Sequence, residues 1–401
     1  MIHTHQTLPL LCVFALAATS ICAQSKEDDA RSEKLANTNL RTNEPLNRFK
    51  LSYRVGFNLS ARFKGMGGFP LRNNPGPAAP TSGDGPHQLI NHSYDDGHNL
   101  VDSHDNNHNE APYDHATWFW DYRDAGQLSG NILSLHSDSS AASGSSKDIE
   151  DNPHHGMELS YDRQLGHIGQ ARWGIEAALG YTDLSFTDNK TYAGGIQRIT
   201  DQYQLLSTDP YDPGLYIDPN DTQGNGPRTF NGPGPFISDL LAAKRSFGID
   251  PNATAQISGK RHLTANLFTG RLGPYVEIPV SKRVSVSLSG GLALVNVDSK
   301  FNFDETVTVT GLGTDRNVGS GSHSDLKLGG YFSGTITVAV CRHADLFASV
   351  QFQSAGTYSH SVVGNSFAVD QGNKFIGHTA KSADIDLGKT IFFSLGIAIP
   401  F

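Results

Sequence analysis

Residues 49–63 alternate strictly between two kinds of side chain. The odd positions, from Phe49 to Phe63, are all apolar, whereas the even positions, from Lys50 to Arg62, are polar, charged or glycine. A period of two is that of a β-strand with two different faces. The run exceeds the roughly 9 to 11 residues that a tilted transmembrane strand needs. Because the charged face cannot contact lipid, we expect it to face the interior of a barrel.

The end of the chain repeats this pattern. From Ile391 to Phe401 the odd positions are apolar and the even positions are mostly small. The chain stops on an aromatic residue in phase with the apolar face. This resembles the C-terminal strand of Gram-negative outer-membrane β-barrels, whose terminal Phe is recognised by the barrel-assembly machinery. The resemblance implies that this machinery contacts the strand ending at Phe401.

Six further segments alternate between these two strands: 157–162, 172–181, 268–278, 284–294, 326–340 and 346–353. Short connections at 166–170, 281–283 and 342–345 alternate with long ones at 64–153, 188–256, 310–323 and 361–379. Outer-membrane barrels sort their connections in this way, with short periplasmic turns and long outer loops. A soluble β-sandwich is the alternative, although it has no reason to sort its loop lengths.

The sequence therefore predicts an all-β fold, a closed antiparallel up-and-down transmembrane barrel over residues 49–401. We expect eight strands, with ten to twelve as the alternative, and long extracellular loops. The pattern is similar to the small outer-membrane barrels of the OmpA and OmpX type. That resemblance implies a location in the cell outer membrane, with outer-membrane lipid and lipopolysaccharide as partners. The extracellular partner stays open.

The N-terminal region reads as an export signal. Residues 8–23 form an apolar stretch that ends in small residues, so residues 1–23 are expected to be a secretory signal peptide. Residues 24–48 are polar and are expected to be a flexible periplasmic segment. Composition excludes two other classes. The net charge of −9 argues against nucleic-acid binding, and the chain after residue 25 lacks the apolar runs of a helical membrane protein.

Several strands have charged residues out of phase with their apolar face, and these are expected to line the barrel interior. Eight strands enclose a space that side chains just fill, so the main expectation is a network of ion pairs. A gated path for small ions and catalysis inside the barrel are the alternatives. The predicted inward set is Lys50, Arg54, Arg62, Arg172, Arg271 and Lys327 with Glu158, Asp162, Glu176 and Glu277.

The first long connection contains a segment rich in His and Asp, residues 95–115. Imidazole and carboxylate groups suit zinc and similar ions, but His98, His104, His108 and His115 match no compact ligand motif. No metal or other cofactor is therefore predicted, although metal binding by this segment stays open. Trp118, Trp120 and Tyr122 follow, and they are expected to extend a strand, to pack the loop or to contact carbohydrate.

No nucleophile motif marks an active site. Ser and His residues expected near the outer rim are His154, His155, His262, His323, Ser324, His360 and Ser361. Because catalytic triads are spatial, the missing motif does not exclude one, but no catalytic residue is predicted. The leading hypothesis is a non-enzymatic surface barrel with interaction loops. A small-solute pore and a barrel enzyme are the alternatives.

Overall fold

The computed structural model describes residues 46–81, 90–100, 116–117, 119–140, 144–151, 153–205, 237–341 and 343–401. The predicted signal peptide, 1–23, and nearly all of the segment 24–48 lie outside these residues. Within the described ranges, no helix is long and apolar enough to cross a bilayer.

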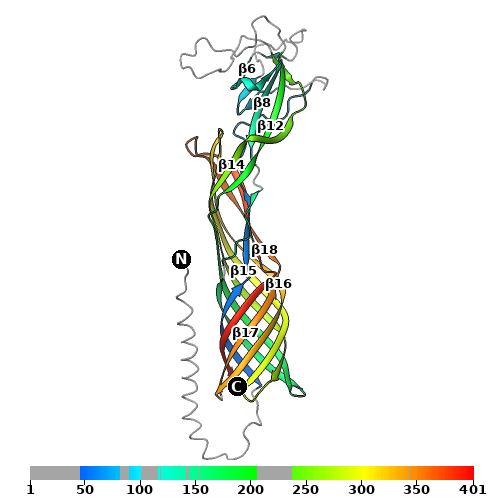
Figure 1. The fold of residues 1–401 in the computed structure, drawn as a ribbon, viewed down its shortest axis with the longest axis vertical. Coiled ribbons are helices and arrows are strands. Elements are labelled where there is room, and N and C mark those ends of the chain that lie inside the picture. Colours follow the sequence, from blue (N-terminus) through cyan, green and yellow to red (C-terminus); the bar gives the residue numbers. More distant parts are fainter. Residues whose placement is uncertain are drawn as a thin grey trace, which may run out of the picture.

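The lower part of the molecule is a closed ring of antiparallel strands (Figure 1). Each strand pairs with the next, and the last pairs with the first, with Leu51 opposite Ile397 at the closure. The all-β antiparallel ring predicted from the sequence is thereby confirmed. In ring order the strands are β1 (Asn47–Phe57), β10 (His154–Ile168), β11 (Ala171–Asp188), β14 (Ser246–Pro279), β15 (Val284–Val309), β16 (Gly313–Cys341), β17 (Ala344–Ser354) and β20 (Thr390–Pro400).

The sheet continues far above this ring as a second storey, the upper barrel. There β18 (Thr357–Ala368) pairs with the upper end of β16, β19 (Lys374–Asp386) pairs with β18, and β2 (Ser60–Met66) pairs with β19. The loops predicted at 310–323 and 361–379 are therefore wrong, because only residues 310–312 and 369–373 form turns. Most of their outward side chains are polar, with Val363 and Phe375 as exposed exceptions. They therefore lack the continuous apolar outer face by which the other strands were recognised.

The two storeys differ in which of their surfaces is apolar: the outer surface in the ring and the interior in the upper barrel. In the ring, the outward side chains are large, apolar and exposed, as Leu272 (57% exposed) and Leu292 (64%) illustrate. On β14 the outward side chains are polar from Asn266 up to Gln256, while Leu267 and Leu263 point inward and are buried. We call the exposed apolar surface of the ring the apolar belt; on β14 it extends from Phe268 to Ile278.

Three neighbouring strands change their facing by adding one residue between storeys. Gly56 and Leu59 are successive inward positions three residues apart, and Asn58 between them has a φ of +58°. The run 49–63 thus alternates without interruption in sequence but reverses in space. Arg62 consequently points outward, its side chain 48% exposed and paired with Asp148 at 2.8 Å, so its predicted inward position is wrong. The same spacing of three separates Ala355 from Tyr358, and likewise Leu387 from Thr390.

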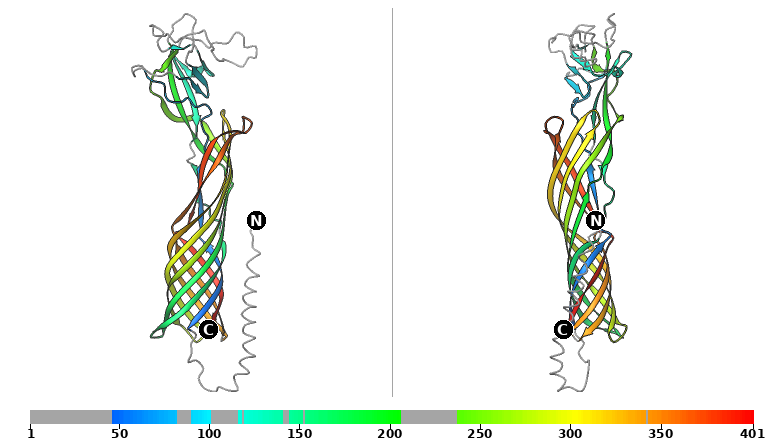
Figure 2. Two further views of the ribbon diagram at one scale, coloured as in Figure 1. Left: turned by 180° about the vertical axis from the view of Figure 1, so that it is seen from behind. Right: turned by 60° about the vertical axis from the view of Figure 1, so that its left-hand side comes forward.

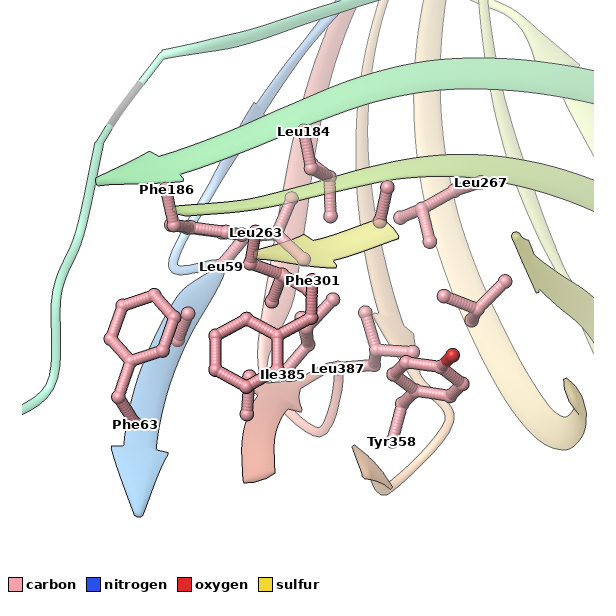
Figure 3. Packing of buried hydrophobic residues seen from close by; sticks show 14 of the residues in the cluster. Leu59, Phe63, Leu184, Phe186, Leu263, Leu267, Phe301, Tyr358, Ile385 and Leu387 are labelled. Atoms are coloured by element: carbon pink, nitrogen blue, oxygen red, sulfur yellow. The ribbon is translucent and has the colours of Figure 1, made fainter. Parts of the chain in front are cut away.

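The upper barrel is filled by an apolar core (Figure 3). Phe63 and Phe301 stack with their ring centroids 5.6 Å apart, and both are about 1% exposed. Side chains from β11, β14 and β15, which continue upward from the ring, meet those of β2, β18 and β19 at this core. The labelled members are Leu59, Phe63, Leu184, Phe186, Leu263, Leu267, Phe301, Tyr358, Ile385 and Leu387.

A small head lies at the far end of the molecule, built from the two longest predicted loops (Figure 2). One sheet contains β3 (His92–Tyr94), β4 (Gly97–Leu100) and β6 (Phe119–Tyr122). Next to it lie β8 (Ile132–Ser139), β12 (Tyr192–Leu205) and β13 (Ile237–Leu241), with the short β5 (Ala116–Thr117), β7 (Leu128–Ser129) and 3-10 helix η1 (Ala125–Gln127). The short β9 (Gly144–Ser145) pairs with β2 of the upper barrel instead. The predicted loops 64–153 and 188–256 are therefore not loops throughout.

The head has an apolar core of its own, separate from that of the upper barrel. Trp120 and Tyr122 stack at 5.8 Å between ring centroids, and both are buried with Leu133 and Tyr203. Of the interpretations given for the aromatic run, packing of the loop fits these two residues. Trp118 lies outside the described residues.

Candidate functional site

The interior of the ring holds a compact set of ion pairs. Lys50 Nζ lies 2.5 Å from Asp162 Oδ2 and 3.4 Å from Glu176 Oε2. Glu158 bridges two arginines, 2.9 Å from Arg54 and 2.6 Å from Arg271. These six residues are all buried, as the sequence predicted for them. Three cations face three carboxylates, so the network carries no net charge.

Aromatic rings close the space around this network. The Arg54 guanidinium lies 3.5 Å from the centroid of Phe392, and that of Arg271 lies 4.5 Å from the centroid of Tyr331. Cations bind favourably over aromatic faces, more so when water is excluded. Together with the apolar core above, these contacts place buried side chains inside both storeys.

The other predicted inward charges lie at the two ends of the ring. Glu277 is buried at the lower end and pairs with Arg48 at 3.1 Å, a partner that the sequence did not suggest. Arg172 is half-buried and opposes Glu277 in the β11–β14 register. Lys327 is also half-buried and pairs with Asp325 at 2.8 Å near the upper limit of the apolar belt.

A second buried charge cluster caps the upper core and was missed from the sequence. Arg261 lies 2.6 Å from Glu305 and 3.1 Å from Asp188, and Lys381 pairs with the other oxygen of Glu305. All four side chains are at most 1% exposed. Burial lowers the pKa of the Lys381 ammonium. Arg261 is a charged residue at an inward position of β14 whose inward neighbours include Leu263. That pattern identifies it only if β14 is known to extend above the ring.

A serine and a histidine meet where β16 and β18 separate. Residues 319–329 of β16 pair with neither β17 nor β18, and the space is filled by buried side chains. Ser299 Oγ lies 2.7 Å from His360 Nδ1 and 2.6 Å from the Tyr358 hydroxyl, and it donates to the carbonyl of His323 at 3.2 Å. Burial lowers the pKa of the His360 imidazole.

This Ser–His pair has the contacts of a packing element. The carbonyl of His323 lies on the unpaired edge of β16, and Tyr358 also donates to it, at 3.0 Å. Ser299 and His360 are 3% and 1% exposed, and no carboxylate of the described residues hydrogen-bonds His360. The two hydroxyls thus hydrogen-bond a backbone carbonyl of β16. A Ser–His–carboxylate triad would need a carboxylate beside His360, and none of the described residues supplies it.

The remaining Ser and His candidates lie apart from one another. His154 packs on Phe186 at 5.2 Å between ring centroids, and His155 hydrogen-bonds Tyr53 on the outer face. His262 contacts Thr187 at 2.9 Å. The last two, Ser324 and Ser361, are exposed. The structure brings only His323 and His360 together from this set, at 5.7 Å between ring centroids.

The described part of the His- and Asp-rich segment is used for hydrogen bonding within the head. His98 pairs with Asp121 at 2.7 Å, and Asp96 contacts His136 at 2.6 Å. Asp95 accepts from the backbone N–H of Asp138 at 2.8 Å. No group of three possible metal ligands occurs among the described residues, and His104, His108 and His115 lie outside them.

The head joins the upper barrel through a narrow neck (Figures 1 and 2). We define the neck as residues 197–200 of β12 paired with residues 246–249 of β14, with β8 on the other side of β12. Arg198 lies 2.8 Å from Asp138 and 2.5 Å from Asp250, so it ties all three strands together. Above it, Arg245 pairs with the buried Asp201 at 2.6 Å.

No protein-family model and no curated protein sequence matches this chain. Among solved structures, it is similar to the outer membrane protease OmpT from Escherichia coli, at 10% identity over 91% of this chain and 99% of that one, with a TM-score of 0.31. It is also similar to a Pseudomonas aeruginosa FadL homologue (8% identity, 90% and 93% covered, TM-score 0.19). It is similar as well to the Ralstonia pickettii toluene transporter TbuX, at 8% identity over 90% of this chain and 90% of that one, with a TM-score of 0.16. At these TM-scores the similarities transfer no activity.

Proposed function

We propose that this chain is an outer-membrane protein whose sealed barrel is a stalk that holds the head away from the cell surface. In this proposal eight strands, β1, β10, β11, β14, β15, β16, β17 and β20, cross the membrane. The head is an interaction module, and neither storey is a pore or an enzyme.

The reversal of facing between the storeys is the observation that carries the proposal. An apolar exterior around a charged interior suits lipid outside, whereas a polar exterior around an apolar core suits water outside. On β14 the ten residue steps from Phe268 to Ile278, at roughly 3.3 Å each and a tilt of about 40°, span about 25 Å along the barrel axis. Outer-membrane barrels have an apolar band of about 25 Å.

The belt also offers a place for an acyl chain, in keeping with lipid and lipopolysaccharide as partners. A groove of about 550 Å³ on its outer face has small residues at Ala177 and Gly270, flanked by Leu272 and Leu294. At the lower end, Phe401 stacks on Phe49 at 5.3 Å, and its N–H donates to Asn47 at 3.0 Å. The terminal aromatic is therefore 57% exposed on the belt, accessible to assembly machinery.

Two features support a stalk over the alternatives. Ion pairs and aromatic rings are buried inside the ring, and an apolar core is buried above them. Both features support a sealed barrel over a pore. The Ser299–His360 pair is buried and engaged with the edge of β16, which argues against an enzyme of that kind.

Thiol labelling of intact cells tests the orientation. Lys244 lies exposed beside the neck, and Gln170 lies exposed in the β10–β11 turn at the opposite end. A membrane-impermeant maleimide should label Lys244→Cys on whole cells and Gln170→Cys only after lysis, with the parent protein as background. Purified protein in planar bilayers should show no conductance steps. Equal labelling at both ends, or regular conductance steps, would overturn the stalk.

A further inference from the structure

One strand edge in the neck is unpaired. β14 pairs with β12 along residues 246–249, but β15 joins its other side only from Ala255, opposite Val309. Among the described residues, none pairs with that second edge over residues 246–254. A free edge exposes backbone donors and acceptors, and proteins normally protect it because another strand can add there.

The same segment exposes two large apolar side chains. Phe247 is 76% exposed and Ile249 is 75% exposed, with the open Gly248 between them. Between this segment and the belt, the outward positions from residue 256 to residue 266 are polar: Gln256, Ser258, Lys260, His262, Thr264 and Asn266. An apolar pair on a free edge, surrounded by polar surface, is typical of an interaction site.

The sequence of this edge is complementary to itself. If two copies pair antiparallel about Gly248, Phe247 of each faces Ile249 of the other, and Ser246 faces Asp250. Aromatic and β-branched residues form favourable cross-strand pairs, and no like charges face each other. Pro251 has no N–H to donate, so it limits the pairing to about five residues.

We propose that residues 246–250 of β14 pair with the same residues of a second copy of this chain that stands in an apposed membrane. β14 runs along the long axis of the molecule (Figure 1). A two-fold pairing of identical edges is isologous and antiparallel, so it points the two barrels in opposite directions. The contact thus joins two membranes. This inference rests on the stalk function proposed above, because only a neck held outside the membrane can meet another.

Each single contact is weak. A five-residue edge buries far less than the roughly 800 Å² per partner of a standard stable interface. Many copies on facing surfaces compensate, since linked binding events raise the overall avidity by roughly 10²–10⁴. The protein is therefore monomeric in dilute detergent and adhesive when crowded in membranes.

Clustering of vesicles tests the pairing and its register. Protein is reconstituted into phosphatidylethanolamine–phosphatidylglycerol vesicles, and turbidity is recorded at rising protein density. Wild type should cluster. Phe247→Lys alone and Ile249→Glu alone should each reduce the clustering rate at least tenfold. Mixing vesicles of the two variants should restore much of it, because the introduced ammonium of one copy then faces the introduced carboxylate of the other. Ser258→Lys, on the same strand, is the matched control and should cluster like wild type.

A symmetric crosslink gives an independent measurement. At the two-fold axis Gly248 faces itself with roughly 4.5–5.5 Å between Cα atoms, within disulfide range. Gly248→Cys should therefore crosslink between two separately labelled vesicle populations, and Ser258→Cys should not. Clustering that Phe247→Lys leaves unchanged, or crosslinks only within one vesicle population, would overturn the pairing. The stalk would survive either result if Lys244→Cys still labels from outside; loss of that labelling would overturn both.

Discussion

The strongest test of the two-storey arrangement is an arginine placed at two outward positions of one strand. Leu272 lies near the middle of the belt on β14, four residues below Phe268 and six above Ile278. Thr264 also points outward, eight residues above Leu272. At roughly 3.3 Å per residue and a tilt of about 40°, the two positions differ by about 20 Å along the axis. Half of the apolar band is only about 12 Å.

Leu272→Arg should therefore cost roughly 2–4 kcal/mol of folding free energy, and Thr264→Arg about 0–1 kcal/mol. The assay is reversible urea unfolding in phospholipid vesicles, followed by tryptophan fluorescence and extrapolated linearly to zero denaturant. The midpoint for Leu272→Arg should fall clearly below that of wild type, while Thr264→Arg should nearly coincide with it. Equal costs at the two positions would refute the claim that only the lower storey contacts lipid.

Three other perturbations address separate features. Phe401→Asp should lower the amount of heat-modifiable folded protein in cell membranes, yet change the stability of protein refolded in detergent by only about 1 kcal/mol; normal membrane levels would contradict recognition of the terminal aromatic. Glu158→Gln leaves two buried arginines without their shared carboxylate, so it should destabilise the barrel by roughly 3–5 kcal/mol without inducing conductance. Unchanged unfolding midpoints would show that the network is hydrated. Asp315, in the upper barrel, has a pKa raised from 3.8 to about 6 by burial, despite the nearby Arg72. Because the folded state holds this proton more tightly, wild type should lose about 1.4 kcal/mol per pH unit relative to Asp315→Asn as pH rises from about 4 to 6. Hydrogen exchange of the surrounding amides, corrected for intrinsic rates, measures this difference, and a pH-independent difference would contradict it.

The strands of the ring were predictable because lipid-facing strands have a distinctive pattern. The outward apolar positions of residues 268–278 and 284–294 fall where the sequence placed them, and so do Lys50 and Glu158 inside. The upper barrel was not predictable in this way. Its strands bury apolar residues such as Phe301 and expose polar ones, and short stretches of that kind also occur in loops.

The facing of Arg62 shows a second limit. Sequence alternation stays intact through residue 58, so nothing in the pattern marks the added residue between Gly56 and Leu59. The reversal depends on the positive φ of Asn58, a conformation that Asn adopts more readily than most residues. The contacts of His360 and the ion pairs of Arg261 join residues of different strands. The spacing of residues along one strand does not show which other strands lie beside it.

The neck has a mechanical consequence for the proposed stalk. Inter-strand hydrogen bonds lie across the strands, and the long strands run along the molecule (Figure 1). A pulling force between head and membrane therefore loads the ladders of the barrel in shear, where many bonds must yield together. In the neck, the force passes through the short ladders between β8, β12 and β14 and through the ion pairs of Arg198. These ladders are shorter than those of either storey, so under tension they yield first. The head then extends while it stays covalently attached to the barrel strands.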